Sequence, residues 1–179
     1  MNKILKLTLI LFLVCAIVAG VLGFVNMITK DRIAEQNAAK TKAAYAAVLE
    51  APDYSDVSFD SAAYPTIDSI SKASDGSGYV VMTTFSGAQG SIQMCVGVKQ
   101  NDNKFLCSGI SIISHSETSG LGAVAASTGE AGKSFRSSFL NKGKDITVKD
   151  IDAITGATIT SKAITGAVST AIQAVEDIA

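Results

Sequence analysis

An uncharged, largely apolar run near the start of the chain, residues 7–28, constrains the fold more than any other feature of the sequence. Only Thr8 and Asn26 in this run are polar. At about 1.5 Å per residue, a helix of this length spans roughly 33 Å, which is enough to cross the hydrocarbon core of a membrane. The sequence therefore predicts an N-terminal transmembrane helix, which we assign to residues 1–30.

Two alternatives to a permanent anchor fit the run less well. A cleavable signal peptide usually has a shorter apolar core, of about 7–15 residues. A lipid anchor at Cys15 would require small residues just before the cysteine, but Phe12, Leu13 and Val14 stand there. We therefore favour an uncleaved, single-pass anchor. The flanking basic residues are nearly balanced and do not set its orientation, and a long C-terminal domain can cross the membrane regardless of such a balance.

The remainder of the chain predicts a helical stalk and one α+β domain. Residues 31–50 are rich in Ala, Lys, Glu and Gln and are followed by Pro52, which is typical of a helix that ends there. We assign the stalk to residues 31–52 and the domain to residues 53–179, with an antiparallel sheet and packed helices. The expected strands are residues 78–85, 91–98 and 105–113, and the expected helices are residues 133–140 and 161–177.

Cysteine usage and charge exclude some classes of protein. A hairpin centred on Asn101 would place Cys95 opposite Cys107, so a disulfide is geometrically possible. We favour two buried free thiols, because free cysteine packs as a small apolar residue. The net charge of −1, without a basic patch interleaved with aromatic residues, argues against a nucleic-acid partner. The single histidine, His115, makes a poor metal site and is expected at a strand end.

The segment before the C-terminal helix carries the strongest chemical signal. Residues 152–161 place several hydroxyl side chains and one glycine at the expected helix start, with Ser161 as the predicted N-cap. The start of a helix offers unpaired N–H groups and the positive end of the helix dipole, which suit a phosphate group. The plain alternative is that these residues only cap the helix.

An internal near-repeat shows which part of this segment is specific. The tetrapeptide Ile-Thr-Gly-Ala occurs at residues 154–157 and again at residues 164–167. The first copy is preceded by Asp152 and followed by Thr158, whereas the second copy is followed by Val168 and lies within the expected helix. Only the first copy therefore combines an acidic residue with a hydroxyl group at the helix start.

The pattern Asp-x-x-Thr-Gly-Ala-Thr over residues 152–158 resembles the flavinylation motif of the bacterial FMN-binding domain family. This resemblance implies that a flavin transferase recognises Asp152 and moves FMN from FAD onto Thr158, where it forms a phosphoester. Further cofactor-binding positions implied near the acceptor are Thr155, Gly156, Ala157, Thr160 and Ser161.

A second segment supports the resemblance. The residues His-Ser-Glu-Thr-Ser-Gly-Leu-Gly at positions 115–122 are similar to the family's His-x-Glu-Thr-Pro-Gly-Leu-Gly loop, except that Ser119 stands in place of proline. The resemblance implies that this loop lines the flavin pocket, and we take Glu117, Thr118 and Leu121 as candidates for the wall beside the isoalloxazine ring. We add Lys142 as a candidate neighbour of the phosphate. The same loop also matches G-x-G-x-x-A, but the βαβ unit that a dinucleotide-binding fold requires does not follow it.

Together with the anchor, these features resemble the G subunits of Rnf electron-transport complexes, to which the C subunits of sodium-pumping NADH:quinone reductases are homologous. The resemblance implies a cell-membrane protein whose FMN domain lies outside the cytoplasm. With other membrane subunits it would relay electrons between ferredoxin and NAD, coupled to ion movement, and the redox chemistry would belong to the cofactor. Two alternatives remain open, namely an anchored flavoprotein of an extracellular reductase system and a non-redox binding domain.

Overall fold

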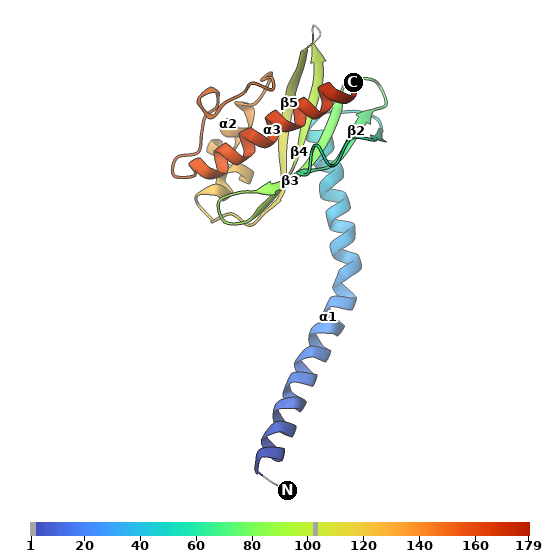
Figure 1. The fold of residues 1–179 in the computed structure, drawn as a ribbon, viewed down its shortest axis with the longest axis vertical. Helices are drawn as coiled ribbons and strands as arrows, with labels where there is room; N and C mark the ends of the chain where they lie inside the picture. The colour runs from blue at the N-terminus through green and yellow to red at the C-terminus, as the bar shows by residue number, and fades with distance from the viewer. Residues whose placement is uncertain (1–2, 102–103) are drawn as a thin grey trace. The chain divides into compact units, whose positions relative to one another are not determined.

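The structure, a computed structural model, describes residues 3–101 and 104–179 and consists of a long N-terminal helix followed by an α+β domain (Figure 1). The chain divides into two compact units, Met1–Lys40 and Thr41–Ala179. The elements in chain order are α1 (Lys3–Val48), β1 (Tyr54–Val57), β2 (Ile67–Ala73), β3 (Tyr79–Ser86), β4 (Ser91–Asn101), β5 (Lys104–His115), η1 (Gly122–Ala126), α2 (Glu130–Ser137), η2 (Val148–Asp150) and α3 (Thr158–Ile178).

Helix α1 is the one helix in the described part of the chain that is long and apolar enough to cross a membrane. Its large apolar side chains from Ile4 to Ile28 are exposed, as expected of a surface that contacts lipid rather than protein. The helix continues without a break through the segment predicted as a stalk. Where the membrane ends along it, at residue 30 in our assignment, stays a prediction.

The sheet has five antiparallel strands in the order β1-β2-β3-β4-β5, so that each strand pairs with its neighbour in sequence. The three predicted strands are confirmed with ends shifted by at most three residues. A short turn at residues 87–90 joins β3 to β4. Strands β1 and β2 add two members that we did not name individually. His115 ends β5, as expected.

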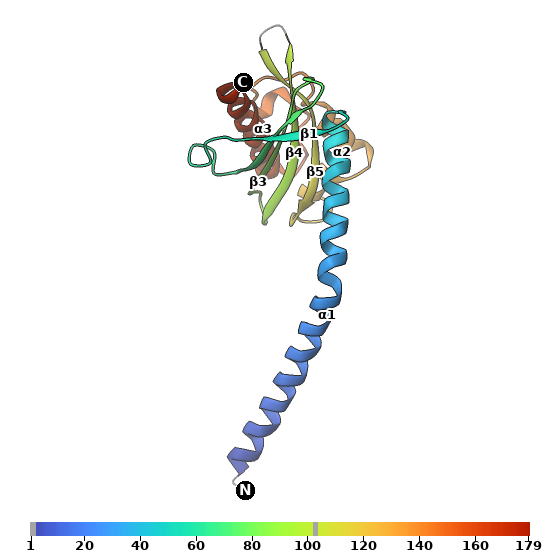
Figure 2. The same cartoon turned by 90° about the vertical axis from the view of Figure 1, so that its right-hand side faces the viewer.

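The two faces of the sheet are covered by different helices (Figure 2). On one face, α3 and Phe135 of α2 pack on the main apolar core, which includes Ile70, Val96 and Ile110 of the strands. On the other face, the last turns of α1 pack through Ala44 and Val48 in a second, smaller cluster. Residues 41–48 of α1 thus belong to the same compact unit as the sheet.

The two strand cysteines lie on opposite faces of the sheet. Cys95 packs in the cluster beside the end of α1, whereas Cys107 packs in the core under α3. The strand register pairs Cys95 with Ser111 and Cys107 with Val98, so the disulfide alternative is wrong and both thiols are free, as we favoured. Burial raises the pKa of each thiol to about 12, which keeps both protonated.

The helices of the domain begin earlier than the sequence predicts. Helix α3 starts at Thr158 instead of residue 161, with Ala157 as its N-cap. Ser161 is fully buried within the first turn, and its Oγ accepts a hydrogen bond from the Ile154 N–H at 3.2 Å. The prediction that Ser161 caps the helix is therefore wrong, because its hydroxyl serves the segment that precedes the helix. Helix α2 likewise starts three residues before the predicted helix.

Candidate functional site

Thr158 is the first residue of α3, and its side chain is exposed. The chain reaches it through a turn in which the Ala157 N–H donates to the Ile154 carbonyl at 3.0 Å. Gly156 adopts φ 78° in this turn, a left-handed conformation that glycine takes readily. The helix's first hydrogen bond runs from the Ser161 N–H to the Ala157 carbonyl, so the N–H groups of residues 158–160 precede the helical ladder.

Glu117, in the 115–122 loop, joins the start of α3 to the turn between β3 and β4. Its Oε2 accepts a hydrogen bond from the Thr160 hydroxyl at 2.5 Å, and its Oε1 accepts one from the Gln89 N–H at 3.0 Å. The Glu117 N–H in turn donates to His115 Nδ1 at 3.3 Å. Glu117 is 9% exposed and Thr160 is 1% exposed, so both ends of the Thr160–Glu117 bond are sheltered from water.

The hydrogen bonds to Glu117 favour its ionised form. Burial alone would raise the pKa of this carboxyl group, but the Gln89 N–H and the Thr160 hydroxyl outweigh that effect. The N–H groups of Ala88 and Gly90 act in the same direction, and the pKa of Glu117 lies below its usual value. The site therefore holds a fixed negative charge next to the start of α3.

The Glu117 carboxylate fits in its place because two neighbouring glycines lack a Cβ atom. A Cβ atom at Gly87 would lie 2.4 Å from Oε1, and a Cβ atom at Gly122 would lie 2.2 Å from Oε2. The Cβ at Gly122 would also lie 2.8 Å from the Thr160 Oγ1. Because any larger residue at either position would displace the carboxylate, close approach requires glycine at both positions.

A small open cavity of about 120 Å³ adjoins these contacts. Most of the residues that the sequence assigned to the cofactor meet here, from the 115–122 loop and from the start of α3. The lining consists of Ala88, Gln89, Glu117, Thr118, Leu121, Gly122, Gly156, Ala157 and Thr160. Thr158 follows Ala157 directly in the chain and is not itself one of the lining residues. The structure therefore brings the two motif segments together at one place.

Besides Thr158, four of the sequence-assigned residues do not line this cavity. Ser161 is buried beneath the helix start, and Thr155 is exposed in the turn. Asp152 is exposed, and its Oδ2 accepts a hydrogen bond from the Ser134 hydroxyl at 2.8 Å. Lys142 lines a different hollow, so the structure does not bring it to the other residues.

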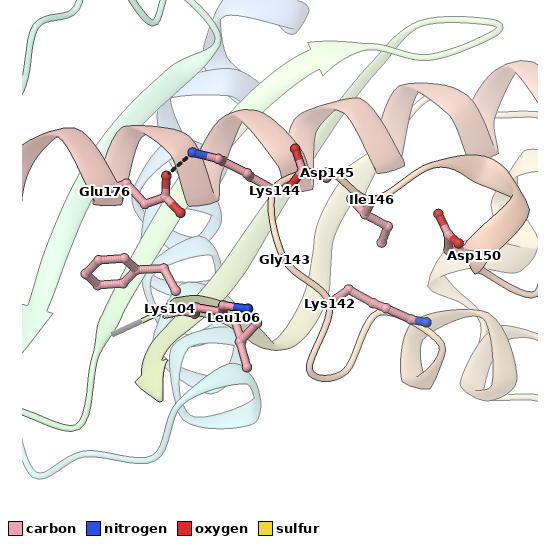
Figure 3. Close-up of a pocket in the computed structure, with 10 residues that line it drawn as sticks. Lys104, Leu106, Lys142, Gly143, Lys144, Asp145, Ile146, Asp150 and Glu176 are labelled. Carbon is pink, nitrogen blue, oxygen red and sulfur yellow. Dashed lines mark hydrogen bonds and ion pairs between the residues drawn. The ribbon is translucent and has the colours of Figure 1, made fainter. Parts of the chain in front are cut away.

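The hollow that contains Lys142 is the larger of the two, at about 490 Å³ (Figure 3). It lies between the start of β5, the 142–146 loop and the end of α3. Lys144 forms an ion pair with Glu176 of α3 at 2.6 Å, and Lys142 lies on the side of the hollow where Asp150 stands. Three lysines and three carboxylates line this hollow, so it presents no single sign of charge to a ligand.

Sequence reasoning missed the contribution of the turn between β3 and β4. Ala88 and Gln89 line the cavity from this turn, and Gln89 contacts Glu117 across 28 residues of sequence. The only local signal is that Gly87 and Gly90 flank the pair. A pattern of two glycines indicates a turn but does not show which loop the turn will meet.

Comparison with known families matches two segments of the chain. Residues 87–173 match the family described as "FMN-binding domain", and residues 1–48 match the "RnfG N-terminal region". The first match begins at the turn that contacts Glu117 and contains every residue assigned to the cofactor. The second match covers α1 from end to end.

Three relatives are similar over long stretches, and each is the G subunit of an ion-translocating complex. The one from the Na(+)-translocating ferredoxin:NAD(+) oxidoreductase complex of Acetobacterium woodii is 31% identical over 97% of this chain and 92% of its own length. The one from the ion-translocating oxidoreductase complex of Methanosarcina acetivorans is 27% identical over 96% of this chain and 94% of its own. The one from the proton-translocating ferredoxin:NAD(+) oxidoreductase complex of Clostridium ljungdahlii is 43% identical, but that match spans about half of either chain, 54% and 52%.

Proposed function

Because the chain belongs to the family of the G subunits of ion-translocating ferredoxin:NAD(+) oxidoreductase complexes, we propose that it is the FMN-carrying electron-transfer subunit of such an Rnf-type complex. The observation that carries this proposal is the exposed Thr158 hydroxyl at the first turn of α3, beside a cavity built from both predicted cofactor segments. The enzyme activity belongs to the whole complex, and this chain supplies one electron carrier to it.

The residues at the start of α3 fit a bound flavin phosphate. The N–H groups of residues 158–160 precede the helical ladder and have no carbonyl partner within α3. They lie at the positive end of the helix dipole, which stabilises a phosphate by up to about 1 kcal/mol when exposed. The Asp152 carboxylate, which would repel a phosphate, is held by Ser134 of α2.

The attachment we propose is a phosphoester at Thr158. Its Oγ1 forms a bond to the phosphorus of the FMN half of FAD, the pyrophosphate P–O bond breaks, AMP leaves, and the hydroxyl proton passes to solvent or to the attaching enzyme. A flavin transferase is the partner that this step requires. Thr158 is exposed at the end of a turn, so such an enzyme has access to its hydroxyl group.

The surrounding residues then orient the bound group and shield it from water. FMN, when bound, supplies electron transfer in steps of one or two electrons. Leu121 stands 46% exposed at the rim of the cavity and is placed to pack on an aromatic ring. Thr118 and Gly122 complete the wall on the same side. Glu117 also lines the cavity, and its carboxylate oxygens are already bonded to protein groups.

We further propose that α1 anchors the chain in the cell membrane and that the FMN domain lies on the extracytoplasmic side, next to other membrane subunits of the complex. The length and apolar surface of α1 support the anchor. The side of the membrane follows from the family resemblance, and it can be tested by the protease sensitivity of the domain in oriented vesicles.

The decisive experiment follows covalent flavin on the full-length chain co-expressed with a flavin transferase. The denatured protein should fluoresce in a gel, and Thr158→Ala should abolish the signal because no acceptor oxygen remains. Thr165→Val is the control, since Thr165 lies in α3 outside both motif segments, donates to the Ser161 carbonyl of its own helix and should keep the fluorescence. Equal loss in both variants, or fluorescence retained in Thr158→Ala, contradicts the assignment.

The remaining alternatives give different outcomes. An anchored flavoprotein of an extracellular reductase system would also fluoresce, but it would purify without integral membrane subunits. A non-redox binding domain would show no flavin in cells that contain the transferase. Purification of the membrane-extracted protein with its neighbouring subunits therefore separates the proposed function from both.

A further inference from the structure

We propose that Glu117 is a positioning residue for flavin attachment, whose carboxylate ties the first turn of α3 to the turn between β3 and β4 and so fixes the Thr158 hydroxyl for reaction. The inference rests on the proposed function, because it concerns the residue that accepts FMN. It assigns Glu117 a role that differs from contact with the isoalloxazine ring.

The hydrogen bond between α3 and Glu117 is direct and is sheltered from water. Thr160 lies two residues after Thr158 in the same helical turn, and its hydroxyl donates to Glu117 Oε2 at 2.5 Å. Thr160 is 1% exposed, so water does not compete for this hydrogen bond. A hydrogen bond between a charged group and a buried hydroxyl group is stronger than one between neutral groups. The bond therefore restrains the part of α3 that carries the acceptor.

The second hydrogen bond of Glu117 connects it to a separate segment, the turn between β3 and β4. Glu117 Oε1 accepts the Gln89 N–H at 3.0 Å, and further N–H groups of the same turn face the carboxylate. The turn is held at both ends by the pairing of β3 with β4, which makes it a fixed support. The carboxylate thus connects a rigid turn to a helix start that has no side-chain cap of its own.

The space around the carboxylate indicates that this connection is specific. Gly87 and Gly122 face its two oxygens, and a Cβ atom at either position would overlap with them. With both oxygens engaged, Glu117 has little capacity left to contact a ligand. The side chain therefore acts through Thr160 on the position of Thr158.

The test compares four substitutions at two positions by the initial rate of covalent flavin incorporation. The full-length chain, purified in detergent without flavin, is incubated with the transferase and FAD, and the rate is read from in-gel fluorescence. Glu117→Gln keeps the length of the side chain and can keep both hydrogen bonds. Its carbonyl can accept from the Gln89 N–H, and its amide can donate to Thr160 Oγ1. Glu117→Asp keeps the charge but is one methylene too short to reach both partners.

A positioning role predicts that Glu117→Gln stays within about threefold of the natural protein, whereas Glu117→Asp slows incorporation about tenfold. Thr160→Val should be slowed to a similar extent, and adding Glu117→Ala to it should slow the reaction no further than either change alone. Thr165→Val is the matched control, since Thr165 is also buried in α3 but donates to the Ser161 carbonyl of its own helix.

Faster flavin incorporation in Glu117→Asp than in Glu117→Gln would overturn the inference. It would show that the negative charge at position 117, and not its hydrogen bonds to Gln89 and Thr160, determines the rate. Additive effects of Glu117→Ala and Thr160→Val would overturn it as well. Failure of the proposed function looks different, because the natural protein itself would then take up no covalent flavin. Thermal unfolding of Glu117→Gln and Glu117→Asp checks that both remain folded at the assay temperature.

Discussion

The tetrapeptide Ile-Thr-Gly-Ala occurs twice in the chain, ten residues apart, and its two copies have different conformations. In the first copy, residues 154–157 form a turn, with Gly156 at φ 78°. In the second copy, residues 164–167 lie inside α3, where Ile164 is fully buried. The same four residues thus form a connecting turn before α3 in one place and part of the helix core in the other.

The difference shows that tertiary contacts, and not the tetrapeptide, decide where α3 begins. Ser161 is buried and accepts the Ile154 N–H through its hydroxyl group, which holds the first copy in its turn. The second copy lies well inside the helix, and each of its N–H groups faces a carbonyl four residues earlier. Matched substitutions in the two copies should therefore have different, and in one case opposite, effects.

The largest difference is expected between the two isoleucines. Ile164→Ala removes a fully buried side chain from the main core and should lower the free energy of unfolding by about 2–5 kcal/mol. Ile154→Ala removes a half-buried side chain at the edge of the same core and should lower it by about half as much. Thermal unfolding of the full chain in detergent measures both. An equal loss would mean that the first copy is packed as tightly as the second.

The two glycines should respond with opposite signs. Gly156→Ala forces alanine into a left-handed conformation and brings its Cβ within 3.2 Å of the Leu121 side chain, so a loss of about 1–2 kcal/mol is expected. Gly166→Ala meets no atom within 4 Å inside a helix and should add about 0.5–1 kcal/mol of stability.

The same unfolding measurement tests the glycine pair. The flavin assay adds a second reading, because Gly156→Ala changes the turn that presents Thr158 and should slow flavin attachment, whereas Gly166→Ala should leave its rate unchanged. A stabilising effect at both positions would show that residues 154–157 can join the helix.

Local patterns predicted most of the sheet and the helices of this domain. Strand-like stretches bounded by glycines and by an Asn/Asp turn located β3, β4 and β5 to within a few residues, and each of these strands buries side chains in the main core. They did not locate β1, whose four residues are half-buried or exposed and carry no clear alternation. The start of α3 was missed by three residues, because Ser161 has the side chain of a good N-cap but is used in a tertiary contact.

The candidate site was predicted from its two motif segments but not from its third. The 115–122 loop and the start of α3 were assigned together, and Glu117, Leu121 and Thr160 do meet at one cavity. Gln89 was missed because its contribution is a backbone N–H, which no side-chain pattern records. Lys142 was named as a candidate neighbour of the phosphate, but the fold places it at a different hollow.

The smallest difference is expected between the two threonines of the repeat. Thr165→Val replaces a buried hydroxyl group that donates to the Ser161 carbonyl at 2.8 Å, and its loss should cost about 1 kcal/mol, partly offset by the added apolar surface. Thr155→Val changes an exposed side chain and should alter stability by less than about 0.5 kcal/mol. Chemical denaturation resolves this difference when both variants are measured beside the natural protein. A larger loss for Thr155→Val would show that its hydroxyl group stabilises the turn before Thr158, and the turn would then have a side-chain contribution that the second copy lacks.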